Sequence, residues 1–469
     1  MEIDLEKINS VYFIGIGGIG LSAIAKFMKE KGKQVSGSDL NSSLITKDLE
    51  NKGIRVYNRQ SEENISQKID LVIYTMAIPK DNLELKKARE LKIKTITYPE
   101  SLGIIFNDKF GIAVCGTHGK SSTTAMAGLL LDDAELDPSI VVGSIVPRYK
   151  SNLRVGVSKY FLIEACEYER AFLNYYPKII VLNNIELDHT DYYEDLDDFK
   201  SAFSEFLTHL PDDGILICNG DDEQISKLKA QMSNQFQSSN VKIINFGLGV
   251  DNDVQAGSVE FEEEQARVQV IYKNENLGEF LLKVPGLFNV YNALATIALG
   301  LYLEIPVEKI KKSLENYSGI WRRFEIKGKY QEALVISDYA HHPTAVKATI
   351  EATKNFYPGK RIFAVFQPHQ HNRTKELYQD FLKSFVAADI LVLTEIFDVA
   401  GREEDRDQII SSLDLVNDIK KQGKAKRKNI FYAKDLAETR KLIDEKIKPD
   451  DILLIMGAGD IYKIADDLV

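Results

Sequence analysis

Short apolar runs alternate along the chain with longer segments whose apolar residues recur at helical spacing. This alternation predicts an α/β protein built on parallel sheets. The runs expected as strands fall into three groups. They are Val11–Ile14, Gln34–Ser36 and Leu71–Tyr74 in the first group; Ile112–Cys115, Tyr160–Ile163, Ile179–Leu182 and Ile215–Cys218 in the second; and Leu334–Ser337, Arg361–Phe366, Ile390–Thr394 and Ile452–Met456 in the third.

The grouping predicts three domains, at residues 1–107, 108–320 and 321–469. A length of 469 residues agrees with this division, since one domain holds roughly 150 residues. One segment departs from the parallel pattern, because Val268, Val270 and Tyr272 alternate with other residues before a turn at residues 274–278. It predicts an antiparallel hairpin attached to the second domain.

The net charge and the composition limit the kinds of partner that we expect for this chain. A formal net charge of −11 argues against nucleic acid and anionic membranes, which need a basic surface. No apolar run approaches the length of a membrane span, and the acidic start Met1–Asp4 does not resemble a secretory signal. Three widely spaced cysteines favour buried thiols in a reducing compartment. We therefore expect a cytoplasmic monomer or weak homodimer with small-molecule partners, and no nucleic-acid or membrane partner.

The first glycine-rich turn follows the strand expected at Val11–Ile14 and opens a helix. It comprises Gly15, Ile16, Gly17, Gly18, Ile19 and Gly20, and Asp39 follows the next strand. Glycines let the backbone approach a diphosphate, and a helix N-terminus offers unpaired N–H groups. The turn predicts a diphosphate-bearing ligand, although a simple tight turn is the alternative. The motif does not distinguish NAD from a UDP-sugar.

A stronger phosphate-binding motif lies between the strand Ile112–Cys115 and an apolar helical pattern. It comprises Gly116, Thr117, His118, Gly119, Lys120, Ser121, Ser122, Thr123 and Thr124. In such a loop the amides cradle phosphate oxygens, Lys120 reaches the terminal phosphates and the Ser121 hydroxyl binds Mg²⁺. The spacing departs from the usual loop, because Val114 stands where the first glycine is expected. Its position between a strand and a helix favours a nucleotide site over a solvated turn.

Polar residues at later strand ends supply further candidates. Glu164 ends one strand and offers a hard oxygen for Mg²⁺, with a surface salt bridge as the alternative. His189 follows the next strand and could be a metal ligand, a proton carrier or a helix-start residue. Asn289 and Asn292 open a later helix, where their amides could read an adenine edge, or Asn289 could cap the helix.

The third domain gathers arginines and histidines after predicted strands. The segments are Arg322–Phe324, Ser337–Pro343 and Gln367–Thr374. Paired histidines suggest zinc, but we see no third ligand at a recognisable spacing. Recognition of anionic and nucleotide groups is therefore the preferred interpretation. The glycine-rich residues 457–460 are interpreted as a simple βα turn.

Taken together, these motifs resemble the signatures of the Mur ligase family, in the family's order and along nearly the whole chain. The resemblance implies a Rossmann-like N-terminal domain, a central P-loop ATPase domain and a Rossmann-like C-terminal domain. It implies ATP and Mg²⁺ as cofactors. The implied reaction joins L-alanine to the lactyl carboxylate of UDP-N-acetylmuramate through an acyl phosphate, in peptidoglycan precursor synthesis.

The resemblance also implies roles for individual residues. Lys120 would contact the ATP phosphates, as would Arg323, with Ser121 and Glu164 on one Mg²⁺ and His189 on a second. Asn289 and Asn292 would contact adenine, and Asp338 and Tyr339 would hold the ribose and base. His369 and Arg373 would approach the amino-acid carboxylate, and the turn Gly15–Gly20 with Asp39 would bind the UDP-sugar. Two positions depart from the family pattern: Gln370 replaces a frequent arginine, and Ser121 replaces threonine but keeps the hydroxyl.

Other functions remain open at this stage. A nicotinamide oxidoreductase would explain the turn Gly15–Gly20 but not the loop Gly116–Ser122. A nucleotide-regulated binding module without ligase chemistry is a second possibility. Within the ligases, the alternatives are a recycling enzyme that adds an intact tripeptide to the same UDP-sugar, and folate-polyglutamate-type ligases.

Overall fold

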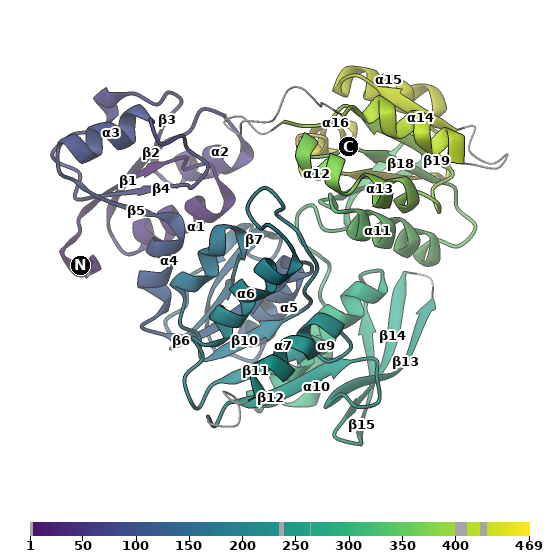
Figure 1. Cartoon of the computed structure of the whole chain (residues 1–469), viewed down its shortest axis with the longest axis horizontal. Coiled ribbons are helices and arrows are strands. Elements are labelled where there is room, and N and C mark those ends of the chain that lie inside the picture. The colour runs from purple at the N-terminus through teal and green to yellow at the C-terminus, as the bar shows by residue number, and fades with distance from the viewer. Residues whose placement is uncertain (1–2, 234–238, 263, 399–409, 423–428) are drawn as a thin grey trace.

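The computed structural model of the chain contains three sheets, which follow one another along the sequence (Figure 1). It describes residues 3–233, 239–262, 264–398, 410–422 and 429–469. We call each sheet with its helices the first, second or third unit. The predicted α/β class is confirmed. Among the described residues, every helix is too short or too polar to span a bilayer.

The first unit is an all-parallel sheet with the strand order β3-β2-β1-β4-β5. Its strands are β1 (Ser10–Ile14), β2 (Gln34–Ser38), β3 (Arg55–Tyr57), β4 (Leu71–Tyr74) and β5 (Lys94–Thr97). Its helices are η1 (Leu5–Lys7), α1 (Ile19–Glu30), α2 (Leu44–Asn51), η2 (Glu62–Asn64), α3 (Leu83–Glu90) and α4 (Tyr98–Phe106). The sequence analysis missed β3 and β5. Both are short edge strands with half-exposed residues, so neither carries an apolar run.

The second unit holds ten strands, in the order β15-β14-β13-β12-β11-β10-β6-β9-β7-β8. They are β6 (Phe110–Cys115), β7 (Ser139–Val146), β8 (Ser151–Arg154), β9 (Tyr160–Glu164), β10 (Ile179–Leu182), β11 (Ile215–Asn219), β12 (Lys242–Gly247), β13 (Val254–Glu262), β14 (Gln265–Tyr272) and β15 (Glu275–Leu282). The helices are α5 (Lys120–Asp133), η3 (Tyr168–Asn174), α6 (Leu196–Leu207), α7 (Glu223–Gln231), α9 (Leu287–Tyr302) and α10 (Val307–Glu315). The predicted hairpin is confirmed as β14 and β15, and β13 extends it on the other side.

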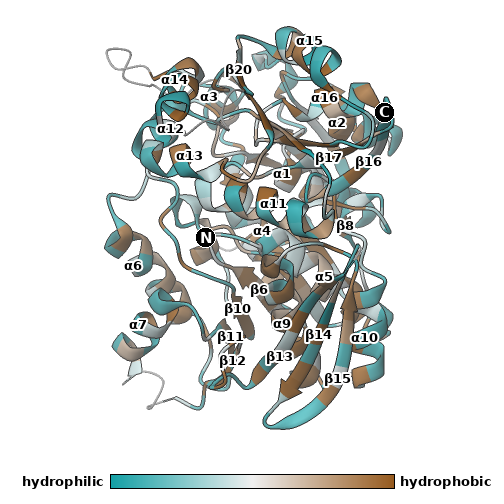
Figure 2. Ribbon diagram, turned by 90° about the vertical axis from the view of Figure 1, so that its right-hand side faces the viewer, coloured by the Kyte–Doolittle hydropathy of each residue, from teal (hydrophilic) through white to brown (hydrophobic). Residues whose placement is uncertain are grey.

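Hydrophobic strands form the middle of this sheet, as Figure 2 shows for β6 and β10. Helices α5 and α9 are buried around most of their circumference and pack together against one face of the sheet; α9 is also largely apolar on all sides. A helix that is apolar on all sides is stable only when it is covered in this way. The loop that precedes α5 is therefore mounted on a rigid, fully packed helix.

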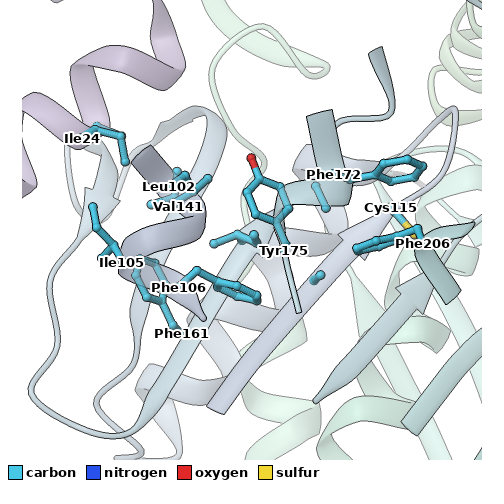
Figure 3. Packing of buried hydrophobic residues seen from close by; sticks show 14 of the residues in the cluster. Ile24, Leu102, Ile105, Phe106, Cys115, Val141, Phe161, Phe172, Tyr175 and Phe206 are labelled. Carbon is cyan, nitrogen blue, oxygen red and sulfur yellow. The ribbon is translucent and has the colours of Figure 1, made fainter. Parts of the chain in front are cut away.

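The first and second units share one hydrophobic core (Figure 3). Ile24 of α1 and Phe106 of α4 lie in the same cluster as Phe161 of β9. The rings of Phe106 and Phe161 meet edge to face, with centroids 5.8 Å apart. Edge-to-face contact is the arrangement that the charge distribution of aromatic rings favours. This core fixes the first unit against the central sheet.

The third unit is a six-stranded sheet with the order β16-β17-β21-β18-β19-β20, in which only β16 runs antiparallel to its neighbour. Its strands are β16 (Glu325–Tyr330), β17 (Ala333–Asp338), β18 (Ile362–Phe366), β19 (Ile390–Thr394), β20 (Ile430–Ala433) and β21 (Ile452–Met456). Its helices are α11 (Pro343–Phe356), α12 (His371–Glu376), α13 (Tyr378–Ser384), α14 (Ser412–Gln422), α15 (Leu436–Lys446) and α16 (Tyr462–Leu468). The four strands predicted here from apolar runs are present as β17, β18, β19 and β21.

Candidate active site

One cavity of about 710 Å³ brings residues of all three units together. Strands β6, β9 and β10 are parallel neighbours, so their carboxyl ends lie at one edge of the central sheet. Ligands of open α/β sheets bind at this kind of edge. The first unit adds Ile19, Gly20 and Tyr98 to the wall, and the third adds residues such as Asp338 and Arg373.

The loop between β6 and α5 is held open by two glycines with positive φ. Gly116 has φ 126° and Gly119 has φ 79°, and a Cβ at Gly119 would collide with the amide of Asn292. The loop is braced from the segment after β10: the His118 N–H donates to Asn184 Oδ1 at 2.7 Å. Thr117 Oγ1 donates to the Glu186 carbonyl at 2.7 Å. The loop is thus preformed at the start of a helix, where anions bind favourably.

Lys120 is the cation of this loop, and its side chain is only 13% exposed. Its ammonium donates to the carbonyls of Gly116 and Thr117, at 2.6 and 3.0 Å, and pairs with Glu167 Oε1 at 2.9 Å. Burial opposes the charge, but the Glu167 carboxylate overcomes it and raises the pKa of Lys120 above its ordinary value. Lys120 therefore stays charged at the place where phosphates would enter.

Glu167 itself was given no role in the sequence analysis. Its side chain is 1% exposed and lies between Lys120 and His189, whose Nε2 is 3.5 Å from Glu167 Oε1. Burial is outweighed by the charge of Lys120 and by the hydrogen bonds to Lys120 and His189, so the pKa of Glu167 is lowered. Its second oxygen, Oε2, has no hydrogen-bond partner among the described residues. The motif Glu164–Glu167 contained the signal, since it offers a second carboxylate after the strand.

The predicted metal ligands divide between two neighbouring places. Ser121 Oγ donates to Glu164 Oε1 at 3.0 Å, and the Gly143 N–H donates to Glu164 Oε2 at 2.6 Å. His189 lies beside Glu167 instead. Hard carboxylate and hydroxyl oxygens are the ligands that Mg²⁺ prefers, and the unpartnered Glu167 Oε2 adds another. The donor set therefore fits Mg²⁺, and the assignment of individual ligands stays a prediction.

The adjacent arginines Arg322 and Arg323 occupy different environments. The Arg323 guanidinium donates to Ser121 Oγ at 3.3 Å, and it lies over the ring of Tyr339, 4.6 Å from the centroid. Arg322 is 6% exposed and donates to the carbonyls of Gly457 and Gly459. The structure therefore brings Arg323 to the phosphate loop, as expected, whereas Arg322 holds the turn after β21.

Asp338 lies at the end of β17, and its carboxylate is already engaged. Its two oxygens accept the N–H groups of Phe324 and Ala340, each at 2.7 Å. These bonds fix the chain around Arg323, and Asp338 and Tyr339 both line the cavity. Contact with ribose and base stays a prediction for both residues.

Asn289 and Asn292 link α9 to the phosphate loop. Asn289 Nδ2 donates to the Pro285 carbonyl at 2.8 Å, and Asn292 Nδ2 donates to Asn289 Oδ1 at 3.1 Å. Asn292 Oδ1 accepts from Thr123 Oγ1 at 3.1 Å. The alternative that Asn289 caps the helix is wrong, because α9 begins at Leu287 after Gly286. Both amides line the cavity, as adenine contacts would require.

One histidine of the third unit lies near a carboxylate and a second histidine from the central unit. Donor atoms of His118, Glu186 and His342 lie within 4.8 Å of one another, a grouping of distant residues that no sequence spacing indicates. His118 Nε2 lies 2.7 Å from Glu186 Oε2, and Thr344 Oγ1 donates to Glu186 Oε1 at 2.6 Å. Although burial opposes them, the bonds and charges of its neighbours, chiefly His118, lower the pKa of Glu186 to about 2. Hydrogen bonds account for this arrangement without a metal.

In the same cavity, Arg373 lies beside His369, whose Nδ1 is 3.3 Å from Arg373 NH1. Both line the cavity, so the structure brings the two predicted amino-acid contacts together. Gln370 is 5% exposed, has φ 69°, and donates its backbone N–H to the Phe397 carbonyl at 3.0 Å. Asp188, which the sequence analysis did not single out, pairs with Arg373.

The glycine turn of the first unit connects β1 to α1 as predicted. Asp39 Oδ2 accepts the Gly17 N–H at 2.9 Å, so this carboxylate holds the turn. Ile19 and Gly20 line the cavity, whereas Gly15, Gly17, Gly18 and Asp39 are not among its lining residues. Binding of a UDP-sugar by this turn stays a prediction.

Comparison with known protein families divides the chain in the same way as the three sheets do. Three family profiles match consecutive parts of the chain: the Mur ligase family catalytic domain at residues 10–110, the Mur ligase middle domain at 114–300 and the glutamate ligase domain of Mur ligases at 322–459. The chain belongs to the Mur ligase family, whose members are ATP-dependent ligases.

Individual relatives narrow the class further. The chain is 40% identical over 469 residues to the UDP-N-acetylmuramate–L-alanine ligase of Caldanaerobacter subterraneus subsp. tengcongensis, covering 99% of this chain and 98% of the relative. It is 43% identical over 464 residues to that of Clostridium tetani, covering 98% of each. The crystal structure of the Thermotoga maritima UDP-N-acetylmuramate–alanine ligase matches with a TM-score of 0.81 and 27% identity, covering 98% of each chain.

Proposed function

We propose that this chain joins L-alanine to the lactyl carboxylate of UDP-N-acetylmuramate, with ATP and Mg²⁺, in cytoplasmic synthesis of peptidoglycan precursors. One observation supports this most directly. A single cavity is lined both by the cation of the phosphate loop, Lys120, and by the neighbouring Arg373 and His369. The named relatives at 40–43% identity support L-alanine as the amino acid. We expect a monomer or weak homodimer.

The first chemical step brings an anion onto a polyanion, because the lactyl carboxylate attacks the γ-phosphate of ATP, forming an acyl phosphate as the bond to the departing ADP breaks. Two unit charges about 4 Å apart repel by roughly 4 kcal/mol at an effective dielectric of about 20. Lys120 and Arg323 both lie at the loop and would offset this repulsion. Mg²⁺ held near Ser121, Glu164 and His189 would supply further positive charge on the phosphate oxygens.

In the second step the amine of L-alanine attacks the acyl phosphate and releases phosphate. Arg373 and His369 would hold the carboxylate of the amino acid, leaving its amine directed into the cavity. Tethering both reactants in one enclosed site replaces a bimolecular encounter and keeps the acyl phosphate from water. Closure around the substrates therefore matters as much as any single contact.

The test measures phosphate and ADP release with UDP-N-acetylmuramate, ATP and Mg²⁺. L-alanine, L-serine, glycine and the tripeptide are compared as amine substrates. We expect the highest kcat/KM with L-alanine. Preference for the tripeptide would assign the chain to the recycling ligases, and no release with any amine would contradict ligase activity on this sugar.

A further inference from the structure

Asp188 and Arg373 form a buried ion pair between the second and third units. Asp188 Oδ1 accepts from Arg373 Nε at 3.2 Å and from NH2 at 2.9 Å, across 185 residues of sequence. Both side chains are 7% exposed. A buried guanidinium without a counter-charge is strongly unfavourable, so this contact determines where the Arg373 side chain can lie.

The geometry divides the guanidinium into two edges. Nε and NH2 face Asp188, while NH1 lies 3.3 Å from His369 Nδ1. Because a guanidinium is planar and rigid, fixing one edge fixes the direction of the other. Asp188 therefore orients the NH1 edge of Arg373 toward His369 in the cavity wall.

Asp188 belongs to a short segment that also contacts the phosphate loop. Its own Oδ1 accepts the His189 N–H at 2.7 Å, which sets the angle of the carboxylate. Two residues earlier, Glu186 contacts His118 of the loop and Thr344 of the third unit. One segment after β10 thus contacts both the phosphate loop and Arg373.

We propose that Asp188 is a positioning residue for Arg373, so that a carboxylate of the second unit aims the guanidinium that receives the amino-acid carboxylate. This inference rests on the proposed function. It means that the amino-acid site is complete only when the third unit is docked on the second. Because residues 186–188 contact both Arg373 and the phosphate loop, this segment would also set the distance between the bound amino acid and the loop.

The test compares L-alanine with L-alaninamide, in which an uncharged amide replaces the carboxylate, in the full-length protein. Asp188→Asn keeps the size of the side chain and removes its charge. We expect KM for L-alanine to rise by about tenfold to a hundredfold, the range found when a supporting contact of a site is lost. KM for ATP and UDP-N-acetylmuramate should stay nearly constant, and the preference for L-alanine over L-alaninamide should fall.

Thr344→Val is the matched control, because it removes a hydrogen bond between the same two units without touching Arg373. It should affect L-alanine and L-alaninamide equally. If Asp188→Asn also affects both equally, Asp188 serves docking alone and the inference is overturned. Should that variant not fold, Asp188→Glu carries the same comparison, since its longer side chain displaces the charge; an unchanged preference would again overturn the inference. Failure of the wild-type protein to use any amine contradicts the proposed function instead.

Discussion

The ammonium of Lys120 and the carboxylate of Glu167 lie 2.9 Å apart; the Glu167 side chain is 1% exposed and that of Lys120 13%. Glu167 also approaches His189, so one carboxylate connects the cation of the phosphate loop to a predicted metal ligand. The pair keeps Lys120 charged and ordered before any nucleotide binds. An incoming phosphate then replaces existing interactions rather than ordering a flexible lysine.

Glu167→Gln should destabilise the protein and impair turnover. The substitution keeps the shape but leaves the buried Lys120 without a counter-charge, which costs about 3 kcal/mol in the free energy of unfolding. Urea denaturation followed by circular dichroism measures this difference. ADP release should fall in parallel because Lys120 and His189 lose their common partner. A variant as stable as the wild type would show that the pair carries little energy.

Ser121→Ala should raise the Mg²⁺ concentration needed for half-maximal activity by about tenfold to a hundredfold. The Ser121 hydroxyl lies 3.0 Å from Glu164, and its loss removes an oxygen from the predicted metal site. The measurement is a Mg²⁺ titration of ADP release at saturating substrates. Ser121→Thr keeps the hydroxyl and is the control. An unchanged Mg²⁺ requirement in the alanine variant would contradict the metal assignment.

Arg322→Met should mainly lower stability, whereas Arg323→Met, at the next position, should mainly lower the rate of catalysis. Arg322 loses two bonds to buried carbonyls, which should lower the free energy of unfolding by about 2–4 kcal/mol. Arg323 contacts Ser121, so its loss should lower kcat by about 10²- to 10³-fold with little effect on stability. Thermal unfolding and steady-state kinetics of both variants test these two roles. A larger loss of stability in Arg323→Met and a larger loss of kcat in Arg322→Met would refute them.

Stability should fall as the pH drops from about 7 to 5, in part because of His341. Burial, and then the neighbouring Arg373, hold the pKa of His341 well below its ordinary value. The unfolded chain therefore binds a proton near pH 6.5 that the folded protein does not, and this favours unfolding at lower pH. The effect amounts to about 1–2 kcal/mol across this window. His341→Gln should flatten the dependence of the unfolding midpoint on pH, and equal slopes would count against it.

Most of the strands predicted from the sequence carry an apolar run, although β7, with the buried run Ile140–Val142, was not predicted. Strands β6, β10 and β18 are fully buried or nearly so and were recognised, whereas the edge strands β3 and β5 were not. Burial at a sheet edge depends on neighbours that a local pattern does not contain. Strand β13 lies inside the sheet, between β14 and β12, but from Gly257 onward its residues are exposed or half-buried, so it carries no apolar run either.

Some residues of the candidate site could likewise be recognised from the sequence, and others could not. Lys120, Ser121 and Glu164 were recognised because each lies in a local motif at the end of a strand. The roles of Glu167, Glu186 and Asp188 depend instead on partners 47, 68 and 185 residues away, respectively. Only the tertiary arrangement brings these charges together.

The two junctions between units differ in kind. Aromatic and aliphatic side chains such as Phe106 and Phe161 seal the first unit to the second, and exposing them to water would be costly. The contacts named between the second and third units are polar, such as Thr344 with Glu186 and Arg323 with Ser121, and water can replace such partners at little net cost. We therefore expect the third unit to separate from the second at a lower cost in free energy than the first unit would, so that any opening of the shared cavity takes place at this polar junction.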